Sequence, residues 1–169
     1  MLLLACIFIG SGCEKEDDLP RWSKITALKN GEPWEAKGTG RLIKKPGSPD
    51  RIFLSANVAT SSGHVSERLV ISNVPMEIGK YELKGDRSSE EPRISFYHMD
   101  GEDALRAVYV TDKEADNFIE IKNIDIKKKE ITGVFKASFL LESSVREDPP
   151  AVSFADGSFR LKIEEFTED

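Results

Sequence analysis

The clearest fold signal in the chain is the stretch Ile25-Thr26-Ala27-Leu28-Lys29-Asn30-Gly31-Glu32-Pro33-Trp34-Glu35-Ala36. Its central pair, Asn30-Gly31, is favoured in a two-residue type I′ turn, because both central positions of that turn need a positive φ. A turn at this pair predicts a β-hairpin in which Ala27 faces Trp34 across the strands. Pro33 then falls at a site where its missing N–H costs no hairpin hydrogen bond, which suits an edge strand.

The chain from residue 22 onward continues in the same pattern. Apolar and polar residues alternate with period two, turn residues recur at short intervals, and no apolar stripe has the 3.6-residue spacing of a helix. Beyond the first hairpin, strands are expected over residues 51–59, 68–74, 79–83, 93–99, 106–111, 118–126, 130–140 and 158–166. Short polar loops without helical crossovers predict an all-β domain over residues 22–169, a single antiparallel β-sandwich or partly open barrel of about nine strands.

A long hairpin is expected near the middle of this domain, turning at Lys127-Lys128-Lys129-Glu130. The apolar residues before its turn are Ile119, Ile121, Ile124 and Ile126. The step of three between the second and third breaks the alternation, so a β-bulge is predicted at Lys122–Asn123 to keep all four isoleucines on one face. The four-residue turn would pair Ile126 with Ile131.

The N-terminus has the pattern of an exported protein. Leu2–Ile9 is an uncharged apolar run that is followed by small residues and Cys13. Eight helical residues reach roughly 12 Å, whereas the hydrocarbon core of a bilayer is about 30 Å thick. A short apolar run closed by small residues is typical of a cleaved signal peptide, here residues 1–12. The alternative is a buried N-terminal strand or helix with Cys13 as a core thiol.

The residues around this cysteine resemble those of bacterial lipoproteins. Gly10-Ser11-Gly12-Cys13 is similar to a lipobox, and the segment after it resembles the surface-export signal of Bacteroidota lipoproteins through Lys15, Glu16, Asp17 and Asp18. The resemblance implies that Cys13 becomes the lipidated first residue of the mature chain. It further implies that residues 13–21 are a tether and that the protein lies in the outer membrane or at the cell surface.

Later motifs extend the resemblance to most of the chain. They are Ile78-Gly79-Lys80-Tyr81, Ile131-Thr132-Gly133-Val134-Phe135 and Asp156-Gly157-Ser158-Phe159-Arg160. Together with the first hairpin they resemble small Bacteroidota lipoproteins of unknown function. These are turn and core residues, so the resemblance implies a β fold and a compartment but no catalytic residues.

Composition narrows the function classes. The formal net charge is −6, which argues against a nucleic-acid-binding protein and against a polybasic membrane patch. Both cysteines, Cys6 and Cys13, lie in the first thirteen residues. The folded domain therefore has no disulfide, no catalytic cysteine and no thiolate metal site.

No catalytic constellation can be identified. The two histidines, His64 and His98, fall in a loop and at a strand end, and nothing in the sequence brings either to a serine and an aspartate. The sequence contains no Gly-x-Ser-x-Gly, His-Glu-x-x-His or Walker-type motif. We therefore assign no catalytic residues and no cofactor, and we expect no enzyme activity.

Two acidic segments have part of the pattern of a calcium-binding loop. Asp112, Glu114 and Asp116 are spaced like the start of such a loop, but Asn117 replaces its glycine and Asn123 its final acidic ligand. A solvated turn is the expected structure, and no metal is assigned. The second segment, with Asp100, Glu102 and Asp103, would bind calcium only if another loop supplied ligands.

The function expected from these patterns is binding or scaffolding by a lipid-anchored β domain. The expected partners are membrane lipid, through Cys13, and an envelope protein or glycan; nucleic acid is not expected. The alternatives are a structural subunit of an envelope complex and a carboxylate-dependent hydrolase. A row of exposed aromatics would favour a glycan, a contiguous apolar patch a protein, and a cleft with converging perturbed carboxylates the hydrolase.

Overall fold

The computed structural model describes residues 23–86, 88–100 and 104–167, none of which is helical. This part of the chain forms ten strands: β1 Ser23–Lys29, β2 Glu32–Lys44, β3 Arg51–Ala59, β4 Val65–Pro75, β5 Gly79–Glu82, β6 Arg93–Met99, β7 Leu105–Thr111, β8 Phe118–Asp125, β9 Glu130–Ser144 and β10 Ala151–Thr167. The all-β prediction is confirmed, and the ten strands agree with the expected number of about nine.

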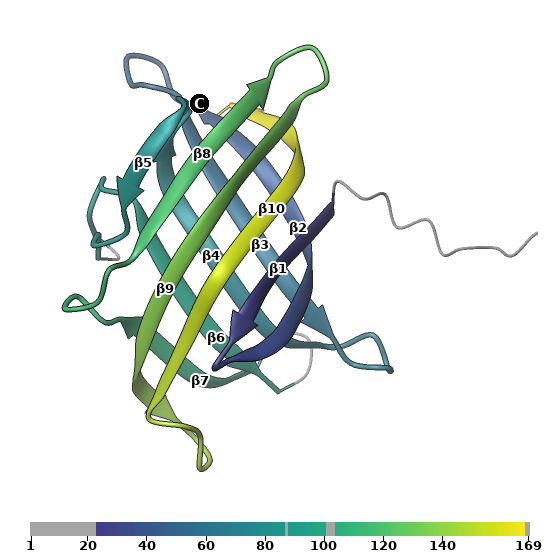
Figure 1. Ribbon diagram of the computed structural model, residues 1–169, viewed down its shortest axis with the longest axis vertical. Coiled ribbons are helices and arrows are strands. Elements are labelled where there is room, and N and C mark those ends of the chain that lie inside the picture. The colour runs from purple at the N-terminus through teal and green to yellow at the C-terminus, as the bar shows by residue number, and fades with distance from the viewer. Residues whose placement is uncertain (1–22, 87, 101–103, 168–169) are drawn as a thin grey trace, which may run out of the picture.

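The ten strands form one sheet that closes into a ring (Figure 1). Around the ring the order is β2-β3-β4-β6-β7-β9-β10, and β10 returns to β2. The short strand β1 lies between β10 and the first half of β2 and pairs with both. On the other side, β9 pairs with β8 through its first half and with β7 through its second half, and β5 extends the sheet beyond β8.

The sheet is not wholly antiparallel, which corrects the prediction on one point. β10 and β2 run parallel from Ile163, which pairs with Gly40, to Thr167, which pairs with Lys44. The direction is imposed by β1, because β1 is antiparallel to both β2 and β10. Beyond the first residue of β1, strands β10 and β2 pair directly with each other. Because both are antiparallel to β1, they are parallel to each other.

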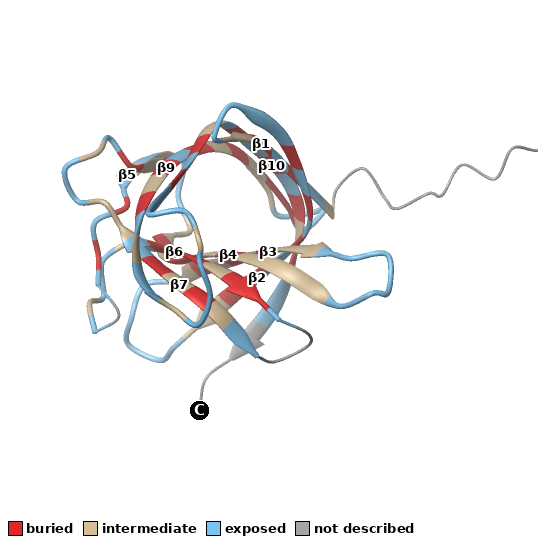
Figure 2. Ribbon diagram, turned by 90° about the horizontal axis from the view of Figure 1, so that it is seen from below, coloured by how far each residue is buried: buried red, intermediate tan, exposed pale blue. Residues whose placement is uncertain are grey.

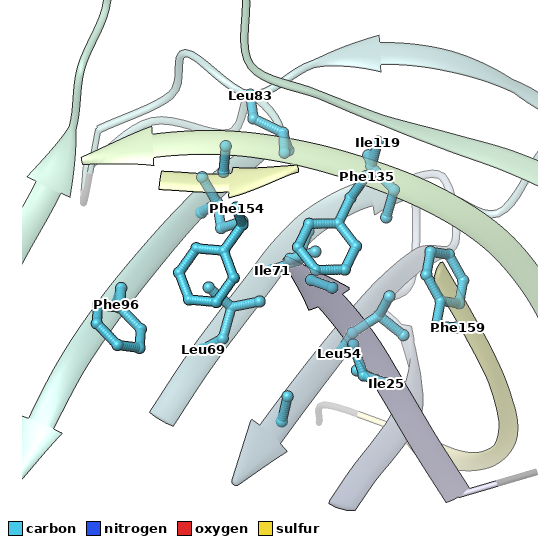
Figure 3. Close-up of a cluster of buried hydrophobic side chains, with 14 of the residues drawn as sticks. Ile25, Leu54, Leu69, Ile71, Leu83, Phe96, Ile119, Phe135, Phe154 and Phe159 are labelled. Atoms are coloured by element: carbon cyan, nitrogen blue, oxygen red, sulfur yellow. The ribbon is translucent and has the colours of Figure 1, made fainter. Parts of the chain in front are cut away.

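The interior of the ring is filled with apolar side chains. Figure 2 shows the buried residues on the inner surface of the ring, and Figure 3 shows how the large ones meet. Phe96, Phe135 and Phe154 are each no more than 1% exposed. Phe154 contacts both other rings, with centroids 5.1 Å from Phe96 and 6.4 Å from Phe135. This packing makes the inside of the ring a core.

The first hairpin has the predicted turn and register. Asn30 and Gly31 have φ values of 53° and 87°, and Ala27 pairs with Trp34. Pro33 pairs with β1 alone, as expected for an edge position. The turn also docks on β10, since the Asn30 N–H donates to the Ser153 carbonyl at 2.9 Å and the Ser153 N–H donates to Asn30 Oδ1 at 2.8 Å.

The long hairpin has the predicted bulge but not the predicted register. The ladder between β8 and β9 shifts between Ile121 and Asn123, which confirms the bulge. Ile124, however, pairs with Ile131, and Ile126 is 81% exposed at the turn. The expectation that Ile126 lies on the core face is therefore wrong.

Local chemistry explains the slipped register. Asp125 Oδ1 accepts a hydrogen bond from the Lys128 N–H at 2.9 Å, and Lys129 adopts a positive φ of 51°, so the turn closes one residue earlier than expected. Gly133 faces Phe159, where an added Cβ would lie 2.5 Å from the Phe159 Cζ atom. The added Cβ would also meet the Glu120 carbonyl of β8, so the observed register, in which Gly133 pairs with Ile121, requires a glycine here.

Candidate functional site

A broad hollow lies on the outside of the ring. It has a volume of about 590 Å³ and is formed by the outer faces of β6, β7 and β9 together with the loops that follow β5 and β7. We call it the outer groove. Val110 and Leu140 form its floor, and its rim carries Asp86, Arg93, Asp112, Lys113, Glu114 and Glu142.

The floor of the outer groove belongs to a longer line of apolar residues, which we call the apolar stripe. Val110 pairs with Leu140 across β7 and β9, and Val108 pairs with Tyr97 across β7 and β6. Val110 and Leu140 are 37% and 47% exposed, whereas Val108 and Tyr97 are half-buried. The inward residue Tyr109, between the two valines, is buried. The stripe therefore crosses three strands on the outer face.

The sequence carries a signal for the apolar stripe that the alternation of apolar and polar residues does not include. Val108-Tyr109-Val110 and Phe139-Leu140-Leu141 are each apolar at three consecutive positions. Successive side chains of a strand point to opposite faces, so such a run must present apolar groups outward as well as inward. Two runs of this kind on paired strands predict an apolar outer patch.

The rim of the outer groove is held in place by its own hydrogen bonds. Asp86 Oδ1 accepts from the Ser88 N–H at 3.0 Å and from the Ser88 hydroxyl at 2.8 Å, and these bonds lower the pKa of the exposed Asp86 carboxyl. Arg93 donates from Nε to the Ser72 hydroxyl at 2.9 Å and from a terminal nitrogen to the Asp86 carbonyl at 3.1 Å. The carboxylates of the rim outnumber its basic groups by four to two.

The first acidic segment with part of the calcium-loop pattern lies on this rim and forms a turn. Asp112 Oδ1 accepts from the Glu114 N–H at 3.1 Å. Asn117 is 2% exposed and holds the turn from inside, donating to the Asp112 carbonyl at 2.5 Å and accepting from the Ser138 N–H at 2.7 Å. Within the described residues, no three His, Cys, Asp or Glu side chains are grouped closely enough to hold a metal ion.

A second polar group, which we call the end cluster, lies buried at the end of the ring where β9 turns into β10. Its central carboxylate is Asp148, whose side chain is 3% exposed. Asp148 Oδ1 accepts from His98 Nδ1 at 2.7 Å and from Arg106 at 2.8 Å, and Oδ2 accepts from the Ser144 hydroxyl at 2.7 Å. Burial alone would raise the pKa of Asp148, but these three hydrogen bonds outweigh it and lower the pKa to about 2.

The other side of His98 faces a second carboxylate. His98 Nε2 lies 3.9 Å from Glu67 Oε1, and Glu67 also forms an ion pair with Lys29. Trp34, which is 7% exposed, donates from Nε1 to Glu67 Oε2 at 2.7 Å. Phe96 packs edge-on against the imidazole of His98, with ring centres 5.2 Å apart.

The end cluster contains a serine, a histidine and an aspartate but not in the order that nucleophilic catalysis needs. A catalytic triad places the imidazole between the hydroxyl and the carboxylate, so that it can take the hydroxyl proton. Here Asp148 lies between Ser144 and His98. The other imidazole nitrogen faces Glu67 inside the protein. This geometry fastens the end of the ring and explains why a histidine is buried there.

The remaining candidate residues are not brought together. His64 lies in the exposed loop between β3 and β4, and Asp100 pairs with Arg146 at 2.5 Å. Glu102 and Asp103 lie outside the described residues. So do Cys13, the export-signal residues Lys15, Glu16, Asp17 and Asp18, and the signal peptide and tether to which they belong.

Comparison with family models, curated proteins and solved structures finds no match to this chain. A search of the described residues for a helix long and apolar enough to cross a bilayer finds none. The lipoprotein resemblance of the N-terminal residues therefore stays a prediction.

Proposed function

We propose that this chain is a lipid-anchored binding module of the bacterial outer membrane or cell surface, attached through Cys13, and that it binds an envelope protein through the outer groove. The observation that carries the binding proposal is the apolar stripe. Leu140, Val110, Val108 and Tyr97 follow one another across three strands on the outer face. An apolar patch on an otherwise polar surface is characteristic of a protein-binding site.

The side chains available on the surface favour a protein over a glycan. Glycan recognition on a sheet is expected to use a row of exposed aromatic rings. Between residues 23 and 165 no Phe, Tyr or Trp is fully exposed, and the most accessible are half-buried: Phe53, Tyr81, Tyr97 and Phe118. The exposed floor of the outer groove is aliphatic, which suits contact with apolar side chains of a protein.

The charge of the rim narrows the chemistry of the partner. Asp86, Asp112, Glu114 and Glu142 surround the aliphatic floor and outnumber Arg93 and Lys113. Complementary charge across an interface speeds association and suppresses wrong partners. We therefore expect a segment that inserts apolar side chains over Val110 and Leu140 and carries lysine or arginine at its flanks.

The carboxylates of the domain support binding rather than glycoside hydrolysis. A hydrolase of that class needs one carboxyl whose pKa is raised, so that it stays protonated as the general acid. The pKa values of Asp86, Asp125 and Asp148 are instead lowered. Asp86 and Asp125 accept hydrogen bonds from backbone and side-chain groups, and Asp148 accepts them from side chains alone. Of these, Asp86 lies on the rim of the outer groove, and its stabilisation as an anion suits contact with a basic partner.

Site-specific photo-cross-linking in cells tests the binding proposal. A photoreactive amino acid at Val110 or Leu140 should yield a discrete cross-linked product that contains peptides of a second envelope protein. The control carries the same group at Thr39, which is exposed on β2 away from the groove. Equal products from Thr39 and Val110, or products without partner peptides, would contradict the proposal.

A charge substitution tests whether the floor itself makes the contact. Leu140→Lys should abolish the cross-link from Val110, because it places a like charge against the basic partner. Thr39→Lys adds the same charge elsewhere and should leave the cross-link unchanged. Since Leu140 is 47% exposed, Leu140→Lys should melt close to the parent temperature. A full-strength cross-link in folded Leu140→Lys would exclude the floor as the binding site.

A further inference from the structure

The turn between β8 and β9 presents an apolar residue beside a run of positive charge. We call residues 126–129 the β8–β9 tip. Ile126 is 81% exposed, and Lys127, Lys128 and Lys129 follow it, all of them exposed. Asp125 pairs with Lys128 at 3.3 Å. Asp50, Glu130 and Glu165 also lie near Ile126 and Lys129, but Glu130 pairs with Arg160 and Glu165 with Lys44. The tip is therefore both apolar and basic.

Nothing in the turn itself requires an isoleucine. The turn is closed by Asp125 Oδ1, which accepts from the Lys128 N–H, and by the positive φ of Lys129. The tip is braced from the side by β10, because the Ile163 N–H donates to the Lys129 carbonyl at 2.8 Å and Lys162 donates to the Lys128 carbonyl at 2.8 Å. The backbone thus holds Ile126 and the lysines outward in a fixed position.

The tip lies close to the point where the N-terminal chain joins the domain. β1 begins at Ser23, which pairs with Leu161 of β10, and Leu161 pairs in turn with Ile131 of β9. Neighbouring strands lie about 4.8 Å apart, and Lys129 precedes Ile131 by two residues, about 7 Å along the strand. In Figure 1 the start of β1 lies in the upper half of the ring, and the β8–β9 turn lies at its upper end.

The chain outside the structure limits how far the domain can lie from its anchor. Nine residues lie between Cys13 and Ser23, which makes ten Cα-to-Cα steps. At about 3.3–3.6 Å per residue they span at most about 33–36 Å. A lipid on Cys13 therefore holds the end of the domain that carries the tip close to the membrane.

We propose that the β8–β9 tip is a second membrane contact, in which Ile126 enters the headgroup region of an anionic bilayer and Lys127, Lys128 and Lys129 bind lipid phosphates. This rests on the proposed lipid anchor at Cys13. Apolar residues flanked by lysines are the composition that binds at the surface of anionic membranes. With a net charge of −6, the chain as a whole is repelled by such a surface. The overall charge argues against a polybasic membrane patch, so the local cluster of lysines at the tip is the part expected to approach the membrane.

Fluorescence of a single cysteine label tests the contact directly. The mature domain has no cysteine besides the lipidated Cys13, so Ile126→Cys introduces one labelling site. The lipidated full chain, labelled with an environment-sensitive dye, is reconstituted into vesicles made of equal parts phosphatidylcholine and phosphatidylglycerol. Val145→Cys is the matched control, because Val145 is 76% exposed in the connection between β9 and β10, at the other end of the ring.

We expect the dye at position 126, and not the dye at 145, to shift its emission to the blue and to be several-fold less quenched by aqueous iodide. Replacing Lys127, Lys128 and Lys129 with glutamate in the Ile126→Cys chain should remove that protection without changing the melting temperature. Flotation of the vesicles separates the two proposals. A chain that does not float overturns the lipid anchor and this contact with it. A chain that floats while its dye at 126 is quenched as fully as that at 145 overturns the contact alone.

Discussion

His98 Nδ1 lies 2.7 Å from Asp148 Oδ1, which joins residues that are fifty positions apart in the sequence. His98 comes from β6, and Asp148 comes from the connection between β9 and β10. The contact is reinforced by Arg106 and Ser144, both of which donate to the same carboxylate. This buried polar group fastens the β9–β10 connection over one end of the ring.

Replacing Asp148 should therefore destabilise the domain strongly. Asp148→Asn removes the charge that His98 and Arg106 share, and it puts an amide where Ser144, His98 and Arg106 all donate. We expect a loss of about 2–3 kcal/mol in the free energy of unfolding at pH 7, measured by urea denaturation. The control is Glu147→Gln, because Glu147 is exposed and adjacent. Equal stability of the two variants would show that the end cluster does not fasten the ring.

The stability that Asp148 contributes should depend on pH in a defined direction. The pKa of Asp148 in the folded protein is about 2, below its ordinary value of 3.8. A lowered folded-state pKa contributes stability that is complete above the ordinary value and is lost as the pH falls toward the folded value. The difference in stability between wild type and Asp148→Asn should thus be constant from pH 7 to about 4 and shrink from about 4 to 2. A difference that grows on acidification would have the wrong sign.

The Asn30-Gly31 turn should matter to stability more than its exposure suggests. Gly31 has a φ of 87° and nothing within 4 Å of an added Cβ, so Gly31→Val tests backbone strain without a clash. A β-branched residue at positive φ should cost about 1–3 kcal/mol, seen as a lower melting temperature. Gly31→Asn is the control, since asparagine tolerates positive φ better and should cost less. An unchanged melting temperature for Gly31→Val would mean that the turn relaxes to another type.

Gly133→Ala tests the register of the long hairpin. The new Cβ would lie 2.5 Å from Phe159 Cζ and would also meet the Glu120 carbonyl. Overpacking of this kind should cost about 1–3 kcal/mol in the free energy of unfolding. Thr132→Ala, one residue earlier and half-buried on the other face, should cost less. Ile126→Ser separates the two possible registers. In the observed register Ile126 is exposed, so this substitution should be nearly neutral. In the register that pairs Ile124 with Gly133, Ile126 would lie on the core face and its replacement would be costly.

The fold could be predicted where its determinants are local. The first hairpin follows from Asn30-Gly31, and the strands 51–59 and 93–99 have the predicted bounds because turn residues flank alternating apolar runs. The bulge followed from the spacing of isoleucines. The turn of the same hairpin was predicted one residue too late. Its position depends on the hydrogen bond that Asp125 accepts in the turn and on the space beside Phe159 that only a glycine fits. The spacing of apolar residues reveals neither contact.

The closure of the ring and the end cluster could not be predicted, because both depend on contacts between residues far apart in the sequence. The pairing of β10 with β2 joins Ile163 to Gly40, and no local pattern marks two strands so far apart in sequence as neighbours. Gly38 and Gly40 have the composition of a turn, yet Gly38 lies inside β2, where an added Cβ would lie 2.8 Å from Ile25 Cγ1. Likewise Glu147-Asp148-Pro149-Pro150 has the composition of any polar loop, although Asp148 is the centre of a buried cluster.

The segment after Cys13 should act as a signal for display at the surface. Replacing Lys15, Glu16, Asp17 and Asp18 with alanine should leave lipidation intact and remove the protein from the cell exterior, measured by protease treatment of whole cells. The matched control replaces Glu32, Glu35, Lys37 and Arg41, exposed on β2, with alanine and should keep wild-type exposure. Equal protease digestion of wild type and the variant in the segment after Cys13 would remove the export signal from the proposal.

Incorporation of labelled palmitate tests the lipid anchor, on which both proposals rest, most directly. The wild type and Cys6→Ala should take up label equally, because Cys6 lies in the segment that is predicted to be cleaved off. Cys13→Ala should take up none and should stay unprocessed or leave the membrane fraction. Undiminished labelling of Cys13→Ala would contradict the anchor, and with it the membrane location of the domain.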